Sequence, residues 1–265
     1  MAPIDSDTSV FNKLRRFNLF MGTLHLVQGV AMVYLGLTLE NIKDFKLPLT
    51  SSFLTYNEAL GRLVTQTEEI TRVPIAIIVS AFLFLSATAH FLIVLPKLND
   101  FYNAKLRIGI NYFRWFEYAI SSSLMIMMIA MLFGIYDIAT LLMLAGLNAT
   151  MNLLGLIMEV HNQTTEKTNW ISFWAGCFAG IIPWIGILIY FLGSGEFARI
   201  PAFVYAILGA YFFFFNTFPI NMYLQYKKVG KWSDYLYGER GYIILSLVSK
   251  SILAWIVFAG TLQPS

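Results

Sequence analysis

The stretch "YIILSLVSKSILAWIVFAG", Tyr242–Gly260, carries a single charged residue, Lys250, among apolar and small ones. A run of about 20 such residues is long enough to cross the hydrocarbon core of a bilayer as a helix. A lysine at the centre of such a helix costs about 2.5–3.5 kcal/mol on insertion scales. We therefore expect Lys250 to serve a function and to have a partner inside the membrane.

The rest of the chain has the composition of a protein that crosses the membrane several times. Its 265 residues are 58% hydrophobic and 12% charged, whereas soluble domains contain about 25% charged residues. The net charge of +3 gives no reason to expect a nucleic-acid partner. Apolar runs of about 20 residues predict an all-α membrane protein, a single domain over residues 1–265. Its seven expected spans are Leu19–Leu39, Val73–Leu95, Ile108–Phe133, Ile138–Val160, Ile171–Leu192, Ile200–Tyr223 and Tyr242–Thr261.

Basic residues between the spans predict the orientation, because positive charge accumulates on the cytoplasmic side. The side of the N-terminus carries Lys13, Arg15, Arg16, Lys97, Lys105, Arg107, Lys167, Lys227, Lys228, Lys231 and Arg240. The other side carries only Lys43, Lys46, Arg62, Arg72 and Arg199. We expect a multi-pass protein of the cell membrane with segment 1–18 cytoplasmic and the C-terminus extracellular. In the long extracellular loop, residues 40–72, "LPLTSSFLTY" is typical of a short β-hairpin. The other connections, such as "PKLNDFYNAKLR", are expected to be turn-like.

Four ionisable side chains lie well inside the spans: Lys250, Glu117, His25 and His90. We count depth from the nearest basic residue at the side of the membrane that holds the N-terminus. By this count Lys250 and Glu117 both lie about 15 Å deep, His25 about 13 Å and His90 about 10 Å. A cation and a carboxylate at equal depth predict an ion pair, since either charge alone would be poorly solvated. Glu117 is the one carboxylate that we expect to be well buried.

Two interpretations of this pair are open. It is either a structural ion pair that fixes the third helix against the seventh, or a site where lysine forms a Schiff base with a carbonyl compound. A Schiff base that is protonated still needs a counterion, which Glu117 would supply. Ser246 lies one turn before Lys250 and Ser121 one turn after Glu117, so each can form a local hydrogen bond.

A polyene aldehyde would also need a long apolar slot with aromatic walls. Trp174 and Trp184 in the fifth span, and Phe212 and Phe215 with the polar Asn216 in the sixth, can supply such walls. Each of these aromatic residues taken alone is more simply explained by packing or by contact with lipid.

Two segments resemble signatures of the heliorhodopsin family: "RWFEYAISSSLMIMM", Arg114–Met128, and "ERGYIILSLVSKSILAWIVFAGTL", Glu239–Leu262. "LHLVQG" and "ATAHF" match the two histidines typical of that family. The resemblance implies a rhodopsin-like seven-helix bundle in which Lys250 carries all-trans retinal and Glu117 is the counterion. It also implies that Ser246 belongs to the hydrogen-bond network, that His25 and His90 line a water-containing cytoplasmic cavity, and that the protein is a homodimer. Further retinal-binding residues are expected at Tyr118, Met151 and Gly155. Ala119 and Ser122 depart from the family pattern.

The sequence favours a sensory photoreceptor over an ion pump. After Lys250 the seventh span contains no titratable side chain, so a proton has no relay toward the outside. His25 and His90 are suited to accept a proton transiently, because histidine titrates near neutral pH. Three alternatives stay open: a light-driven ion transporter or channel, a transporter that uses the Lys–Glu pair without retinal, and a membrane enzyme or light-regulated modulator of a partner protein. We expect no enzymatic activity, and the cytoplasmic signalling partner is unknown.

Overall fold

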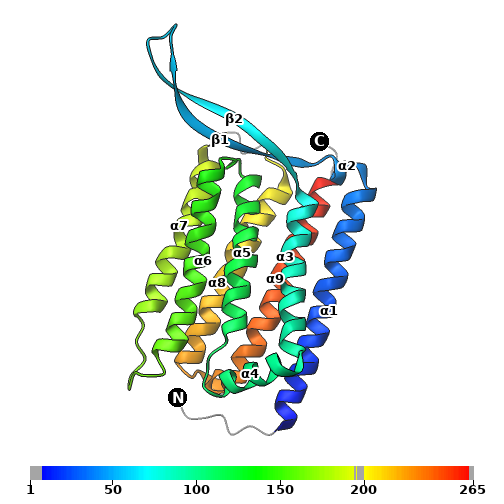
Figure 1. Cartoon of the computed structure of the whole chain (residues 1–265), viewed down its shortest axis with the longest axis vertical. Coiled ribbons are helices and arrows are strands. Elements are labelled where there is room, and N and C mark those ends of the chain that lie inside the picture. The colour runs from blue at the N-terminus through cyan, green and yellow to red at the C-terminus, as the bar shows by residue number, and fades with distance from the viewer. Residues whose placement is uncertain (1–7, 194, 196–199, 263–265) are drawn as a thin grey trace.

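The computed structural model describes residues 8–193, 195 and 200–262 of the chain. Within these residues, seven helices are long and apolar enough to cross a membrane, which confirms the predicted seven-helix fold. Figure 1 shows them side by side in one bundle. They are α1 (Thr8–Thr38), α3 (Ile75–Val94), α5 (Tyr112–Leu132), α6 (Ile138–His161), α7 (Ile171–Gly193), α8 (Ala202–Tyr226) and α9 (Tyr235–Thr261).

The packing order places α5 and α9 in the interior of the bundle. α1 packs against α3 and α9, α3 against α5, α5 against α6, α6 against α7, and α8 against α9. In their most apolar windows, 56% of α5 and 50% of α9 are buried, more than in any other described span. These two helices carry Glu117 and Lys250, so both charged residues lie on the two most buried helices of the bundle.

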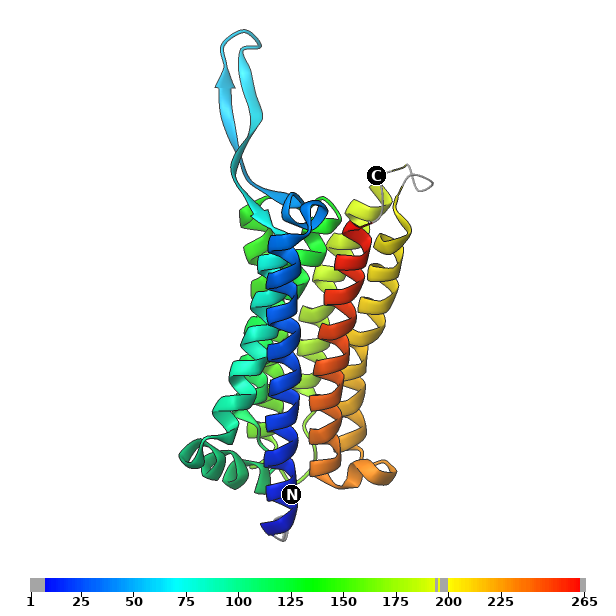
Figure 2. The same ribbon diagram turned by 90° about the vertical axis from the view of Figure 1, so that its right-hand side faces the viewer.

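The two ends of the bundle differ. α1 begins at one end, here named the N-terminal end, and α9 finishes at the opposite end (Figures 1 and 2). The opposite end also carries the β-hairpin and is named the hairpin end. Which end faces the cytoplasm stays a prediction.

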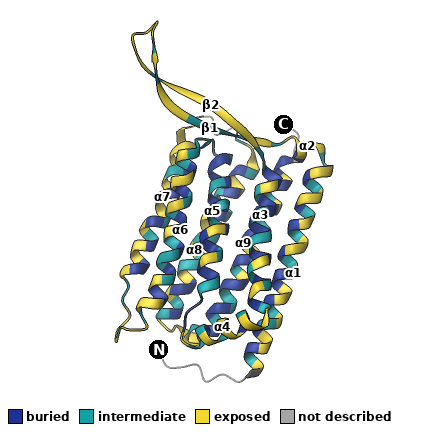
Figure 3. Cartoon of the chain, viewed as in Figure 1, coloured by how far each residue is buried: buried dark blue, intermediate teal, exposed yellow. Residues whose placement is uncertain are grey.

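The hairpin is present but much longer than the short one expected. Strands β1 (Lys46–Asn57) and β2 (Arg62–Pro74) pair antiparallel, with Lys46 opposite Pro74 and Asn57 opposite Arg62. β2 includes the first two residues of the expected second span, so α3 begins at Ile75. The hairpin projects beyond the bundle (Figure 2), and Figure 3 shows that most of it is exposed.

Asp137 fixes the base of this hairpin to the bundle. Its side chain caps α6 by accepting the backbone N–H of Thr140 at 2.9 Å, and it accepts the backbone N–H of Ser52 in β1 at 3.1 Å. The backbone N–H of Thr50 donates to the carbonyl of Tyr136 at 2.9 Å. The Thr140 N–H holds the pKa of Asp137 below its usual value, because the bond favours the carboxylate.

The segment "PKLNDFYNAKLR" is a helix, α4 (Pro96–Arg107), and the expectation of a turn-like connection was wrong. Pro96 occupies the first turn of the helix, where its missing N–H has no cost. Asn99, Tyr102 and Leu106, spaced at three and four residues, turn one buried face toward the bundle. α4 therefore places Tyr102 against the end of the bundle where α1 begins, in contact with Glu239 on α9.

Two spans begin earlier than their apolar runs indicate, because a helix continues into polar sequence beyond the lipid core. α1 begins at Thr8 instead of Leu19, and α9 begins at Tyr235 instead of Tyr242. Asp234 caps α9 by accepting the N–H of Leu236 at 2.9 Å. Short elements complete the described chain: α2 (Glu40–Lys43) and the 3-10 turn η2 (Gly230–Ser233).

Candidate functional site

Lys250 and Glu117 form an ion pair in the interior, as their equal depth suggests. Nζ of Lys250 on α9 donates to Oε1 of Glu117 on α5 at 3.1 Å. The two side chains are 3% and 9% exposed, so the pair is shielded from solvent. Nζ also donates to the hydroxyl of Ser246 at 2.9 Å. Ser246 thus lies in the network where the sequence places it.

Ser121, one turn after Glu117, is fully buried and interacts with the Glu117 carboxylate, as its spacing suggests. No hydrogen bond of its hydroxyl has normal geometry among the described residues. The other hydrogen bond to Oε1 of Glu117 comes from Ser86 on α3, at 2.6 Å. Ser86 was missed, although it lies one turn before His90 and therefore on the same helix face.

His25 on α1 and His90 on α3 stack on each other, with ring centroids 5.6 Å apart and planes inclined by 17°. Nδ1 of His90 lies 2.8 Å from Oδ1 of Asn18. Because an amide oxygen only accepts hydrogen bonds, Nδ1 carries the hydrogen. Both ring nitrogens of His25 lack a hydrogen-bond partner within the described chain. The structure therefore brings the two predicted histidines together, but within the described residues only His90 has a hydrogen-bond partner for its ring.

A small polar cavity of about 30 Å³ adjoins the ion pair. This volume accommodates about two water molecules. His90 lines it, whereas His25 does not, which corrects the expectation for His25. The polar lining residues are Asn18, Ser86, His90, Asn111, Arg114, Glu117, Tyr118, Glu239, Tyr242 and Ser246. The cavity therefore joins the Lys250–Glu117 pair to a second group of charges near the N-terminal end.

On its other side, Lys250 opens into a larger and mainly apolar cavity of about 160 Å³. Helices α5, α6, α7, α8 and α9 surround it, and Lys250 lies in its wall. Six of the predicted retinal-binding residues line it: Tyr118, Met151, Gly155, Trp184, Phe215 and Asn216. Trp115, Met125, Asn152 and Phe218 also line it and were missed.

Two predicted wall residues lie outside this cavity. Trp174 is 60% exposed on the outer face of α7, and Phe212 is 48% exposed on α8. Phe212 packs edge-on against Trp184, with ring centroids 5.6 Å apart. Trp174 lies ten residues before Trp184. At about 100° per residue this is about 80° short of three full turns, so the two side chains point in different directions.

Gly155 is required by the shape of the cavity. The ring of Trp115 on α5 packs against the α-carbon of Gly155 on α6, in the space that a side chain would occupy. Trp115 stands edge-on to Tyr118 and Tyr242, with centroids 6.4 Å and 5.9 Å away. Glycine thus lets α6 approach closely enough for Trp115 to close one end of the cavity.

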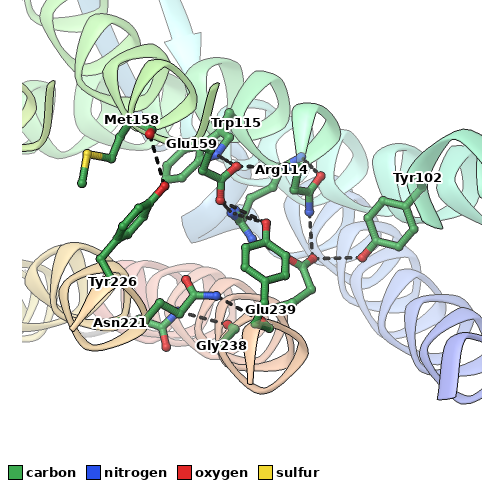
Figure 4. A network of polar contacts seen from close by, with 12 residues as sticks. Tyr102, Arg114, Trp115, Met158, Glu159, Asn221, Tyr226, Gly238 and Glu239 are labelled. Atoms are coloured by element: carbon green, nitrogen blue, oxygen red, sulfur yellow. Dashed lines mark hydrogen bonds and ion pairs between the residues drawn. The ribbon is translucent and has the colours of Figure 1, made fainter. Parts of the chain in front are cut away.

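The polar cavity leads to a buried charge cluster, here named the Arg114 cluster and made of Arg114, Glu159 and Glu239 (Figure 4). The guanidinium of Arg114 forms ion pairs with both carboxylates, and all three side chains are at most 3% exposed. The expectation that Glu117 is the one well-buried carboxylate was therefore wrong. Glu239 and Glu159 lie near span ends in the sequence, and they are buried by side chains from α4, α5 and the start of α9.

Neutral donors complete this cluster. Glu159 accepts the indole N–H of Trp115 at 2.6 Å, the backbone N–H of Asn111 at 2.9 Å and the hydroxyl of Tyr235 at 3.1 Å. Glu239 accepts the Asn111 side-chain amide at 2.8 Å and the Tyr102 hydroxyl at 2.9 Å. Burial raises the pKa of Tyr102 well above its usual value, so Tyr102 remains a neutral donor.

The residues around Lys250 fit a retinal group. Nζ stands where the nitrogen of a retinal Schiff base would lie, and Glu117 is in place to balance its positive charge. The adjoining cavity is lined mainly by aromatic and aliphatic side chains, which suits a polyene. Lys250, Glu117 and Ser246 would hold the polar end of the group, and Trp115, Trp184 and Phe215 would contact its chain.

Comparison with known proteins agrees with this geometry. The family model for heliorhodopsin matches residues 14–262. No curated protein matches the chain. The matched range includes most of α1 and all of α2 to α9, and with them the Lys250–Glu117 pair, the two histidines and the Arg114 cluster. This chain belongs to the heliorhodopsin family of rhodopsin-type light-sensing membrane proteins, which bind retinal through a lysine.

Proposed function

We propose that this protein is a sensory photoreceptor with a slow photocycle, without net ion transport, in which all-trans retinal is bound to Lys250 and Glu117 is the counterion. One observation carries the proposal: Nζ of Lys250 lies 3.1 Å from a buried carboxylate and in the wall of an apolar, aromatic cavity. Bound retinal supplies light absorption and a light-driven change of shape.

The distribution of polar groups supports sensing over pumping. From Lys250 toward the N-terminal end, the bundle contains Ser246, His90 and the Arg114 cluster. Toward the hairpin end, the buried polar side chains of the described residues are uncharged, such as Ser80 and Asn148, and the rest of the core is apolar. A proton that leaves Nζ therefore has groups to bind on one side only, and it returns by the same route.

The retained proton suits a signalling role. Loss of the proton from Nζ removes the attraction between Lys250 and Glu117, which crosses from α9 to α5. A buried carboxylate without its partner is costly. The unpaired charge of Glu117 therefore favours a shift of α5 and α9 until the proton returns. We propose that the N-terminal end is cytoplasmic and passes this shift to a signalling partner.

The hairpin supports the proposed homodimer. A two-stranded hairpin on its own is marginally stable, yet this one projects beyond the bundle with Phe53, Leu54, Tyr56 and Leu63 exposed. A second copy would cover these side chains. Light scattering of the detergent-solubilised protein tests this: a dimer that becomes monomeric after Leu54→Ser and Tyr56→Ser supports it, and a wild-type monomer refutes it.

Expression with all-trans retinal tests the cofactor proposal. We expect a coloured protein that hydroxylamine bleaches, and no colour in Lys250→Ala. A colourless wild type would refute the retinal proposal and leave a transporter that uses the bare ion pair. Photocurrents or light-induced pH changes in cells that express the coloured protein would show instead that it transports ions.

A further inference from the structure

We infer that Glu239 is the group that binds the proton released from Lys250. This inference deepens the proposed function and rests on it for the light-driven step. The two histidines are the obvious acceptors in the sequence, but the Arg114 cluster offers two carboxylates, one of which lines the other end of the same cavity.

The first argument is the charge of the cluster. One guanidinium pairs with two buried carboxylates, so the cluster has one negative charge in excess. The Lys250–Glu117 pair is balanced and does not offset it. An excess buried charge is unfavourable even when it is well hydrogen-bonded. Uptake of one proton would leave a balanced pair of Arg114 and one carboxylate.

The second argument is that hydrogen-bond donors surround both carboxylates. The partners of Glu159 include the indole of Trp115 and the backbone N–H of Asn111, and those of Glu239 include the side-chain amide of Asn111. These groups, like Arg114, only donate hydrogen bonds. Such partners favour the charged form of a carboxyl group. The resting cluster can therefore take up a proton.

The third argument selects Glu239 from the two carboxylates. Glu239 lines the polar cavity together with Glu117 and Ser246, whereas Glu159 does not line it. Glu239 and Ser246 are seven residues apart on α9, two turns along the same face, and Lys250 follows one turn later. The distance from Glu239 to Lys250 is about 16 Å along the helix axis. Ser246 and the polar cavity lie between the two side chains.

The surroundings of Glu239 allow it to carry the proton. The titratable groups that face it are Tyr102, Arg114, Tyr118, Glu159, Tyr235 and Tyr242, with His90 and Glu117 across the cavity. Tyr102 already contacts Oε1 of Glu239 through its hydroxyl. A hydroxyl can accept as well as donate, so it can turn to accept the new O–H. In this step an N–H bond at Lys250 breaks and an O–H bond at Glu239 forms.

The inference also connects the chromophore to the surface of the protein. Tyr102 belongs to α4, which lies across the N-terminal end of the bundle in Figure 1. When Glu239 is neutral, its attraction for Arg114 and its charge-assisted bond to Tyr102 both weaken. α4 is therefore the element that we expect to respond to the proton.

Infrared difference spectroscopy tests the inference, first without retinal. We expect acid titration of the retinal-free protein to produce a carboxylic-acid C=O absorption that Glu239→Gln lacks. Tyr102→Phe should shift this absorption to higher frequency, because it removes a hydrogen bond from Glu239. Tyr235→Phe is the matched control, since it removes the same kind of bond from Glu159 and should leave the frequency unchanged. An absorption that moves with Tyr235→Phe, or persists in Glu239→Gln, refutes the inference.

The second measurement is the light-minus-dark spectrum of the retinal-loaded protein. We expect the same C=O absorption to appear as Lys250 loses its proton, with the same response to Tyr102→Phe. Its disappearance only in Glu117→Gln would make the counterion the acceptor, and the absence of any such absorption in the wild type would favour the histidines. If no pigment forms, the proposed function fails, while the retinal-free titration still decides whether Glu239 binds the proton.

Discussion

Replacement of Glu117 by glutamine should shift the absorption of the retinal-loaded protein to lower energy. Glutamine has nearly the same shape and keeps an oxygen for the Ser86 hydroxyl, which lies 2.6 Å from Oε1 of Glu117. The substitution thus removes the negative charge with little change in packing. Excitation moves positive charge away from Nζ along the polyene, so the carboxylate stabilises the ground state more than the excited state.

The distance between the charges sets the size of this shift. In the ground state the positive charge lies 3.1 Å from the carboxylate, and with an effective dielectric constant of about 20 it is stabilised by about 5 kcal/mol. If excitation moves this charge along the polyene to about 8 Å from the carboxylate, the stabilisation is about 2 kcal/mol. The transition energy should therefore fall by about 3 kcal/mol in Glu117→Gln.

An absorption spectrum, recorded at a pH that keeps Nζ protonated, checks this value. Asp137→Asn is the control, because it removes a carboxylate at the hairpin end, far from Lys250, and should leave the spectrum unchanged. An unshifted or higher-energy band in Glu117→Gln would show that this carboxylate does not balance the charge on Lys250.

Three further predictions concern packing and the hairpin. Gly155→Ala places a methyl group against the Trp115 ring, so we expect a loss of about 1–3 kcal/mol in thermal unfolding; unchanged stability would contradict this contact. Trp184→Ala should cost about 3–5 kcal/mol and reduce retinal uptake, whereas Trp174→Ala, on the exposed face, should change neither; equal effects in titrations of retinal would contradict the cavity assignment. The lowered pKa of Asp137 means that its contribution is complete above the usual aspartate pKa and is lost as the pH falls through its lower folded value. Amide hydrogen exchange, corrected for intrinsic rates, should show the protection of Ser52 lost in Asp137→Ala, which removes the acceptor, at neutral pH, and weakened in the wild type only in acid; equal protection in both proteins would refute the anchor.

Much of the site could be read from the sequence because depth along a membrane helix is a linear measure. Lys250 and Glu117 are both ten residues from a basic residue that marks the membrane edge, and a constant rise per residue then puts them at the same level. Rotation about the helix axis is not fixed in this way for side chains on different helices. For that reason Trp184 was placed correctly and Trp174 was not.

Burial near span ends was the larger omission. Hydropathy places Glu239 and Glu159 at the membrane edge, where charged side chains are usually exposed to water. α4 and the first turns of α9 extend the bundle past that edge, and Tyr102, Asn111 and Tyr235 then cover both carboxylates. The helical periodicity of Asn99, Tyr102 and Leu106 was the signal that could have revealed α4.

The sequence by itself determined the number of spans, the lysine in the last one and the depth of its partner. These follow from the cost of placing polar groups in lipid, which acts on each helix separately. Tertiary structure alone decided that Ser86, from a third helix, donates to Glu117, that Gly155 makes room for Trp115, and that one arginine serves two buried carboxylates. Those contacts depend on how neighbouring helices rotate and approach one another, which packing sets jointly for all of them.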